Sequence, residues 1–381
     1  MKNLSKRLLW FTLGLLVIIL IAATLIYWLA VAEPDTNIES GSGDNRNQSV
    51  AAVLTKQVVK DAETRGAVCN DGSEAIYYLR EGSGTNTDKW IFWFKGGGGC
   101  GDEDNCRQHL DQDLSATSSL RAPETRSLGG IMSPDPNDNP DFYNWNHVMI
   151  HYCSSDTWTG DVVQSNGDWK ISFRGDKIVE AVIEDLDIAS ASELILSGSS
   201  GGGTGAMHQL DDIATLVPNV RVTGLIDSSW EIDYPAFRTA SVDAEALSQE
   251  AYNYRRNDLD DSCEAAEASD PSVCFIQEFA EPYIQTPTFY FINQYDRAKA
   301  EVLGVTNLKR PEQKAYLDQH AAAIRDSLAE KDGVFVPAGN DHVTLINEAY
   351  QQTTIDGQSF QKIFTNWYFD RPGLTRLIEE P

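Results

Sequence analysis

The stretch "LILSGSSGGGTGAMHQL", residues 194–210, carries an apolar run of strand length into a helix-like segment through a turn of serine and glycine. Its centre, "GSSGG" at residues 198–202, fits the G-x-S-x-G pattern of a nucleophile elbow, in which a serine occupies a tight turn between a strand and a helix. Small neighbours permit that strained turn, and the helix start adds unpaired N–H groups. We therefore expect Ser200 to be a nucleophile. A phosphate-binding loop is the alternative, but no lysine follows the glycines.

Apolar runs of strand length alternate with helical patterns on both sides of this stretch. We expect strands at residues 76–79, 90–94, 147–153, 193–198, 220–227, 287–293 and 333–339. We expect helices at residues 174–190, 202–217, 309–331 and 343–351. Because several strands are apolar at consecutive positions, both faces of the sheet should be covered. The alternation predicts an α/β fold with a largely parallel central sheet, in which functional residues follow the carboxyl ends of strands.

A nucleophilic serine needs a histidine as base, and the chain has six histidines. His342, in "VPAGNDHVT", follows the last expected strand, where a loop can bring its ring over the sheet. The others are expected to be solvated (His109 and His320), in the sheet (His147 and His151) or in the core (His208). We therefore expect His342 to be the base.

The base in turn needs an acid, and Asp296 follows the expected strand in "PTFYFINQYD". The order Ser200, Asp296, His342 is that of α/β hydrolases. Asp227, after the strand that follows the elbow helix, is the alternative acid. Asp341 is adjacent to His342 in sequence, which makes a pairing of their side chains awkward.

The second glycine-rich stretch is "WIFWFKGGGGCGDEDNC", residues 90–106. Each glycine costs on the order of 1 kcal/mol of backbone entropy on folding, so four in a row indicate that a bare backbone is required. Acyl transfer needs two backbone N–H donors for the oxyanion, one from the residue after the nucleophile and one from a loop after an early strand. We expect Gly201 to supply the first donor and residues 96–99 the second.

Six cysteines form an even set, which in an oxidising compartment indicates disulfides. Short separations favour Cys100–Cys106 and Cys263–Cys274, which leaves Cys69–Cys153, although about 15 connectivities are possible. No C-x-x-C or clustered His/Cys spacing occurs, so we expect no metal site.

The N-terminal segment, residues 1–32, has basic residues up to Arg7 and then an uncharged apolar run at 8–32. That run is long enough to cross a bilayer, which predicts a signal-anchor transmembrane helix with the basic flank in the cytoplasm. Cleavage after Ala32 is the alternative and would give a secreted protein. Residues 33–49 are polar and predict a flexible linker, and residues 50–381 form the domain. Both interpretations place the domain in the periplasm or outside the cell.

The formal charge is −27, which argues against nucleic acid as a partner. Such a surface is typical of a soluble domain, and we expect a monomer.

Five motifs occur in a recognisable order. They are "VCNDGSEAIYYL", "FKGGGGCGDEDNC", "HVMIHYCSSDTWTGD", "LSGSSGGGTGA" and "LIDSSW". Together they resemble the pectin acetylesterase/Notum family of carboxylesterases over most of residues 55–350. The resemblance implies an α/β-hydrolase fold with three layers, a Ser-Asp-His triad, no cofactor and hydrolysis of O-acyl esters.

The resemblance also implies a role for each residue of this chain that matches one of the family's motifs. It gives Ser200 as nucleophile, Asp296 as acid, His342 as base, Gly97 and Gly201 as oxyanion donors, and disulfides Cys69–Cys153 and Cys100–Cys106. Two departures stand out: Lys95 where the family has glutamate, and Gly98 and Gly99 where it places a tryptophan. The missing aromatic side chain predicts a more open acyl pocket.

These observations predict a serine carboxylesterase that removes short acyl groups, acetyl above all, from a glycan such as pectin or another small O-acyl ester. A non-catalytic glycan-binding member of the fold and a transacylase are the alternatives.

Overall fold

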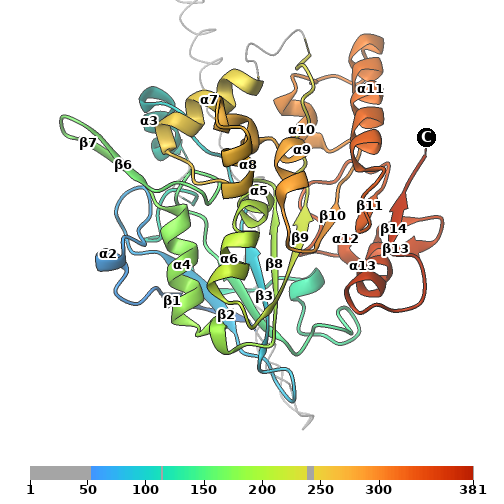
Figure 1. Cartoon of the computed structure of the whole chain (residues 1–381), viewed down its shortest axis with the longest axis horizontal. Coiled ribbons are helices and arrows are strands. Elements are labelled where there is room, and N and C mark those ends of the chain that lie inside the picture. Colours follow the sequence, from blue (N-terminus) through green and yellow to red (C-terminus); the bar gives the residue numbers. More distant parts are fainter. Residues whose placement is uncertain (1–52, 113–114, 238–243, 381) are drawn as a thin grey trace, which may run out of the picture. The chain divides into compact units, whose positions relative to one another are not determined.

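The computed structural model describes residues 53–112, 115–237 and 244–380 (Figure 1). The expected membrane anchor at residues 8–32, the linker at 33–49 and the boundary at residue 50 lie outside these residues and stay predictions. Among the described residues, no helix combines the length and apolarity needed to cross a membrane.

A sheet of ten strands forms the centre of the domain, in the order β14-β11-β10-β9-β8-β3-β5-β2-β1-β4. The parallel part consists of β14 (Arg376–Ile378), β11 (Val334–Val336), β10 (Thr288–Phe291), β9 (Arg221–Asp227), β8 (Glu193–Ser199), β3 (Lys89–Phe94) and β5 (Asn146–Ile150). The antiparallel part consists of β2 (Ile76–Arg80), β1 (Leu54–Val58) and β4 (Thr125–Arg126). All seven expected strands are present, and the sheet is largely parallel as predicted.

Helices cover both faces of this sheet. One face packs against α4 (Gly175–Asp185), α5 (Gly201–His208), α6 (Leu210–Leu216) and part of α11 (Pro311–Leu328). The other packs mainly against α13 (Phe360–Tyr368) and the short helix η1 (Gly130–Met132). Strand β3 shows why its sequence is apolar at consecutive positions from Trp90 on: Phe92 and Phe94 enter the first core, whereas Ile91 and Trp93 enter the second.

The remaining elements connect these strands and helices along the chain. The helices are α2 (Ala62–Arg65), α3 (Glu103–Gln112), η2 (Ile188–Ser190), α7 (Ala244–Arg255), α8 (Asp261–Ala266), η3 (Pro271–Phe275), α9 (Gln277–Ala280), η4 (Glu281–Tyr283), α10 (Arg297–Val302) and α12 (Ala349–Gln352). Two hairpins complete the set, β6 (Val162–Asn166) with β7 (Trp169–Phe173) and β12 (Thr354–Ile355) with β13 (Gln358–Ser359).

One expected helix, at residues 343–351, is wrong over most of its length. Only α12 is helical there, because Val343 has a φ of +64° and the residues that follow it are bound to a carboxylate of the sheet. The expected helix at 202–217 divides into α5 and α6.

The register of the parallel strands brings four loops to one edge of the sheet. Ser199 is aligned with Asp227, Asp227 with Phe291, and Phe291 with Phe335. The loops after β8, β9, β10 and β11 therefore start side by side. The loops after β8, β10 and β11 carry Ser200, Asp296 and His342, and Asp227 is the last residue of β9.

Candidate active site

Ser200 occupies the turn between β8 and α5 with φ +58° and ψ −132°, a conformation that costs a residue with a side chain about 1 to 3 kcal/mol. Its N–H donates to the carbonyl of Asp227 at 3.0 Å, which holds the turn against β9. A Cβ on Gly198 would lie 2.1 Å from the Gly202 oxygen, and one on Gly202 would lie 2.1 Å from the Phe94 oxygen. The glycines of the G-x-S-x-G pattern are therefore required by close backbone contacts.

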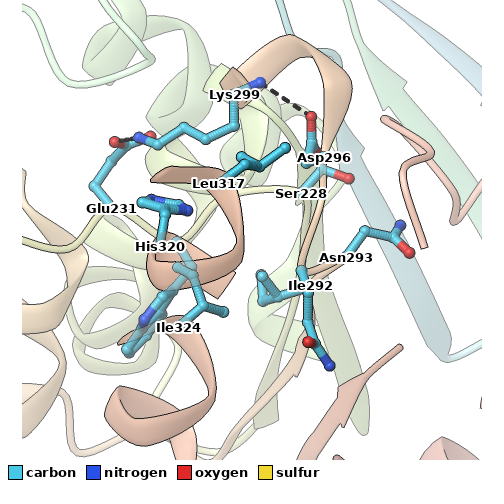
Figure 2. A pocket seen from close by; sticks show the side chains of 11 residues that line it. Ser228, Glu231, Ile292, Asn293, Asp296, Lys299, Leu317, His320 and Ile324 are labelled. Carbon is cyan, nitrogen blue, oxygen red and sulfur yellow. Dashed lines mark hydrogen bonds and ion pairs between the residues drawn. The ribbon is translucent and has the colours of Figure 1, made fainter. Parts of the chain in front are cut away.

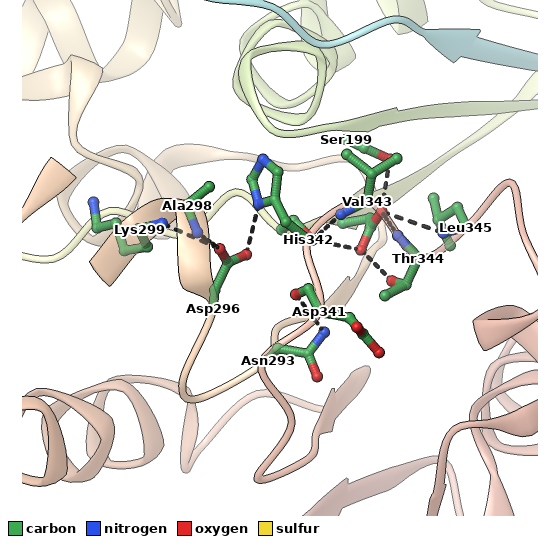
Figure 3. A network of polar contacts seen from close by, with 12 residues as sticks. Ser199, Asn293, Asp296, Ala298, Lys299, Asp341, His342, Val343, Thr344 and Leu345 are labelled. Carbon is green, nitrogen blue, oxygen red and sulfur yellow. Dashed lines mark hydrogen bonds and ion pairs between the residues drawn. The ribbon is translucent and has the colours of Figure 1, made fainter. Parts of the chain in front are cut away.

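The structure brings His342 and Asp296 together, with Nδ1 of the imidazole 2.7 Å from Oδ2 of the carboxylate (Figure 3). The other carboxylate oxygen accepts the N–H groups of Ala298 at 2.9 Å and Lys299 at 3.1 Å, in the first turn of α10. Asp296 is thus fixed on both oxygens. With Nδ1 donating to it, Nε2 is the nitrogen of His342 left to accept a proton.

Opposing effects set the pKa of His342. Burial lowers it, but the hydrogen bond and charge of Asp296 and the charge of Asp227 raise it, while the charge of Arg297 lowers it. The net result is a pKa above the ordinary value for histidine. His342 is therefore a stronger base than a free imidazole.

Asp227, the alternative acid, is fully buried and hydrogen-bonds the loop that carries His342 instead of its ring. Its carboxylate accepts the N–H groups of Thr344 at 2.8 Å and Leu345 at 3.3 Å, and the hydroxyl of Ser199 at 2.6 Å. Burial raises the pKa of Asp227, against the lowering effect of these bonds. Asp227 thus joins the elbow to the loop that carries His342 (the histidine loop), and we call this connection a clamp.

The glycine-rich loop lies against the elbow. A Cβ on Gly201 would lie 2.7 Å from the oxygen and 3.7 Å from the nitrogen of Gly97, so the two backbones are in contact. A Cβ on Gly97 would lie 2.5 Å from the ring of Tyr152, and one on Gly96 would lie 2.4 Å from the oxygen of Ser199. As the first residue of α5, Gly201 has an N–H with no intrahelical acceptor.

The motif "YCSSDTWTGD" supports this loop. Tyr152 packs under Gly97, the carbonyl of Ser155 accepts the N–H of Cys100 at 3.2 Å, and the indole N–H of Trp158 donates to the carbonyl of Lys95 at 3.2 Å. The glycine loop is held from its first residue to its last.

Comparisons with known proteins agree with this geometry. The family model described as Pectinacetylesterase matches residues 47–381. The chain belongs to the pectinacetylesterase family. Its relatives include the palmitoleoyl-protein carboxylesterase NOTUM of Drosophila melanogaster, 32% identical over 86% of this chain and 49% of the relative, and that of Homo sapiens, 30% identical over 78% and 63%. The chain therefore spans about half to two thirds of the length of these relatives.

The structure of the Wnt deacylase Notum from Drosophila superimposes on this family member with a TM-score of 0.80 and 31% identity, covering 86% of this chain and 97% of that chain. The predicted α/β-hydrolase fold with a mostly parallel sheet is confirmed.

Gly98 and Gly99, where we expect a tryptophan from the family resemblance, have different surroundings. A Cβ on Gly98 would make only an ordinary contact of 3.6 Å with the ring of His109. One on Gly99 would lie 2.8 Å from the guanidinium of Arg255 and 2.9 Å from the oxygen of Ser155. Arg255, which is 5% exposed, thus fills the space beside Gly99. The expectation of a more open acyl pocket stays a prediction.

A small cavity of about 30 Å³, enough for a water molecule, has Asp296 in its wall (Figure 2). Lys299 pairs there with Glu231, and burial lowers the pKa of Lys299 to about 8. His320 also lines the cavity and is only 2% exposed, so the expectation that it is solvated is wrong. His147, His151 and His208 are buried as expected.

Three disulfides are present in this family member, Cys69–Cys153, Cys100–Cys106 and Cys263–Cys274, the same pairs as expected. The second closes the glycine-rich loop. Among the described residues, no three His, Cys, Asp or Glu side chains are grouped so as to hold a metal ion.

Proposed function

We propose that this chain is a serine carboxylesterase that hydrolyses O-acyl esters through an acyl-enzyme, with acetyl esters of a glycan such as pectin as its substrates. The observation that carries the proposal is the 2.7 Å contact of His342 with Asp296, at the edge of the sheet where the elbow presents Ser200. Membership of a family named for pectin acetylesterase, and relatives named as carboxylesterases, support the same reaction class.

The reaction begins when Oγ of Ser200 attacks the ester carbonyl and Nε2 of His342 takes its proton. The N–H groups of Gly97 and Gly201 stabilise the oxyanion that forms, each by about 3 to 4 kcal/mol. His342 then gives the proton to the alcohol oxygen, the C–O bond breaks and the alcohol leaves. Water, deprotonated by the same histidine, attacks the acyl-serine, and the acid and free Ser200 are released.

A short acyl group fits the surroundings of the glycine loop better than a long apolar chain. Arg255 places a guanidinium beside Gly99, and an apolar chain against a nearly buried cation would desolvate it without providing a partner. The relatives whose names specify palmitoleoyl esters thus differ from the substrate proposed here.

The domain acts outside the cytoplasm in this proposal. Three disulfides are typical of an oxidising compartment, and the predicted anchor at residues 8–32 would deliver the domain there.

Hydrolysis of p-nitrophenyl acetate by the purified full chain tests the proposal. We expect a burst of nitrophenol, then steady turnover, and loss of both in Ser200→Ala. Ser190→Ala, at an exposed serine on the surface of the domain, is the matched control and should retain them. Undiminished turnover in Ser200→Ala would refute the mechanism.

Two further measurements separate the alternatives. A fluorophosphonate probe should label the wild type but not Ser200→Ala, whereas a non-catalytic glycan-binding protein would show no labelling. Adding an alcohol acceptor should leave acetate as the main product, whereas a transacylase would transfer the acetyl group to the alcohol.

A further inference from the structure

Residues 155–158, which we call the strained segment, hold three side chains in the left-handed region of the backbone. Ser155 has a φ of +51°, Thr157 of +56° and Trp158 of +71°. For a threonine, which is branched at Cβ, and for a bulky tryptophan such angles are outliers. They persist only where the surrounding structure enforces them, and they cluster at active sites. The strain therefore indicates a function, and the contacts of the segment indicate which one.

Thr157 is fixed in this conformation by hydrogen bonds of both its amide and its hydroxyl. Its N–H donates to the hydroxyl oxygen of Tyr152 at 2.9 Å, and its own hydroxyl donates to the carbonyl of Asp156 at 2.6 Å. The next N–H, that of Trp158, donates to the carboxylate of Asp156 at 2.9 Å. This carboxylate is fully buried and also accepts the N–H of Gly175 at 2.7 Å. Because the hydroxyl of Thr157 is held, its methyl group has a fixed direction.

On one side, the strained segment is bound to both ends of the glycine-rich loop. The carbonyl of Ser155 accepts the N–H of Cys100 at 3.2 Å, and the indole N–H of Trp158 donates to the carbonyl of Lys95 at 3.2 Å. Gly97, the first proposed oxyanion donor, lies between these two points in the sequence. The strained segment thus fixes where the loop that presents Gly97 starts and ends.

On the other side, the strained segment packs against α5, whose first residue is Gly201, the second proposed donor. The carbonyl of Trp158 accepts the side-chain N–H of Gln209, directly after α5, at 2.9 Å. A Cβ on Gly205 would lie 2.5 Å from the oxygen of Thr157, so the helix and the segment approach each other through their backbones. The strained segment therefore connects the two parts of the chain that carry the two donors.

The methyl group of Thr157 lies close to the second donor. A Cβ on Gly201 would lie 3.6 Å from this methyl and 2.7 Å from the oxygen of Gly97. A side chain at residue 201 would therefore collide with Gly97, whereas the methyl of Thr157 borders the same space without entering it. An oxyanion is stabilised only when both N–H groups lie about 2.7 to 3.1 Å from it, so the spacing of Gly97 and Gly201 must be fixed before the reaction.

We propose that Thr157 is a positioning residue of the oxyanion site: its methyl group, held by the strained segment, sets the spacing between Gly97 and Gly201. The inference rests on the proposed function, since an oxyanion forms only if Ser200 attacks an ester. It adds to that function a residue that acts through the two backbone donors.

Two substitutions of Thr157 separate its methyl group from its hydroxyl. Thr157→Ser keeps the hydroxyl and loses the methyl. We expect kcat and kcat/KM for p-nitrophenyl acetate to fall together by about 10-fold, because the donors act on the oxyanion of the transition state. Thr157→Val keeps the methyl, and its branched side chain is stiff, so it should stay within about 3-fold of the wild type. A Thr157→Val variant as impaired as Thr157→Ser would overturn the assignment to the methyl.

Inhibition by trifluoroacetone separates positioning from a loss of folded protein. Oγ of Ser200 adds to the carbonyl carbon of this ketone and its proton passes to His342, which leaves the ketone oxygen as an oxyanion between the same donors. We expect the inhibition constant to rise in Thr157→Ser by the factor by which kcat/KM falls. A fraction of unfolded chains would lower the apparent kcat and leave the inhibition constant unchanged. An unchanged inhibition constant would therefore overturn the proposal.

Thr159→Ser is the matched control, because it loses the same methyl group in the same motif. Thr159 is fully buried, and its hydroxyl also donates to the carbonyl of Asp156, at 3.2 Å. Within the described part of the chain, its methyl is not among the three atoms nearest to a Cβ on Gly97 or on Gly201. We expect kcat and the inhibition constant to stay within about 3-fold of the wild type. A fall equal to that in Thr157→Ser would mean a general disturbance of the motif and would overturn the proposal.

A comparison of Thr157→Gly with Thr157→Ala tests the strain. At a φ of +56° glycine avoids the clash that alanine meets, so Thr157→Gly should unfold at a higher urea concentration than Thr157→Ala and be no more active. A glycine variant that is more stable and as active as the wild type would refute the positioning role.

The wild type distinguishes a failure of this inference from a failure of the esterase. If the wild type and Thr157→Ser hydrolyse p-nitrophenyl acetate equally well, the esterase stands and the positioning role is refuted. If the wild type shows neither a burst nor turnover, the esterase is refuted and the inference falls with it.

Discussion

The carboxylate of Asp227 accepts the backbone N–H of Thr344 at 2.8 Å, which ties the end of β9 to the loop that carries His342. Among the described residues, each group that hydrogen-bonds this buried carboxylate donates to it. The donors come from Ser199, Ser228, Thr344 and Leu345. In Asp227→Asn the amide NH₂ would face donors, and we expect a loss on the order of 3 kcal/mol in the free energy of unfolding.

The same variant should also lower kcat for p-nitrophenyl acetate, because the histidine loop loses its clamp. Urea denaturation and steady-state kinetics measure the two effects. Asp296→Asn is the comparison: it should reduce activity as much or more, with a smaller loss of stability, because the amide oxygen of asparagine can still accept the N–H groups of α10. Wild-type stability in Asp227→Asn would contradict the clamp.

The acidic limb of the pH profile of kcat/KM should reflect the protonation of His342. The base must be neutral, so kcat/KM falls as pH drops through its pKa, which is raised above the ordinary value by Asp296. Asp296→Asn removes both effects of Asp296 that raise the pKa. It leaves burial and the charge of Arg297, which lower the pKa, against the charge of Asp227 alone, which raises it. The limb should therefore move to lower pH while the plateau falls by about 10³- to 10⁴-fold.

Arg297→Met should shift the acidic limb in the opposite direction, which checks that the limb belongs to His342. The charge of Arg297 lowers the pKa of His342, so its removal should move the limb to higher pH. Profiles of kcat/KM from pH 5 to 9 measure both variants. Shifts in the same direction would show that the limb belongs to another group.

The strain at Ser200 predicts that a serine at this position lowers the stability of the fold. At φ +58° and ψ −132° glycine is free of the clash that a side chain meets, so Ser200→Gly should be about 1 to 2 kcal/mol more stable than Ser200→Ala. Both variants lack the proposed nucleophile, so the comparison concerns stability alone. Ser190 lies outside the left-handed region, so there glycine should be less stable than alanine. The midpoints of urea denaturation of Ser200→Gly, Ser200→Ala, Ser190→Gly and Ser190→Ala test this prediction.

The sequence predicted the central strands well because they are buried on both faces and carry continuous apolar runs, as β3 and β8 do. It did not predict β1, where polar Thr55, Lys56 and Gln57 interrupt the pattern, because that strand lies near the antiparallel edge of the sheet. The expected helix after His342 failed for a related reason. Its periodicity is that of a helix, but long-range bonds to Asp227 fix a different backbone.

Within the site, Ser200, Asp296 and His342 could be found because each follows a strand at the same edge of a parallel sheet. The roles of Asp227, Tyr152 and Arg255 could not, because they depend on contacts between distant segments. "LIDSSW" did contain a signal for Asp227, an acidic residue at the end of an apolar strand. It could be interpreted equally well as a triad acid or as a clamp.

The disulfide Cys100–Cys106 should matter more for catalysis than for stability. In the loop-entropy model, its separation of six residues corresponds to about 2 kcal/mol, and the separation of 11 residues in Cys263–Cys274 corresponds to about 3 kcal/mol. Replacing both cysteines of either pair by alanine should therefore cause similar losses in urea denaturation.

The two double variants should differ in kcat. Cys100 ends the loop that begins at Gly96, and its N–H is bound to Ser155, so opening the disulfide frees the segment that presents Gly97. A displaced oxyanion donor costs about 10²- to 10³-fold in kcat, and a partly freed one should cost at least 10-fold. The variant without Cys263–Cys274, measured under conditions where both remain folded, should keep kcat within about 3-fold of the wild type. If both variants keep wild-type kcat, Gly97 is held by Tyr152 and the Ser155 carbonyl alone, and the disulfide serves only stability.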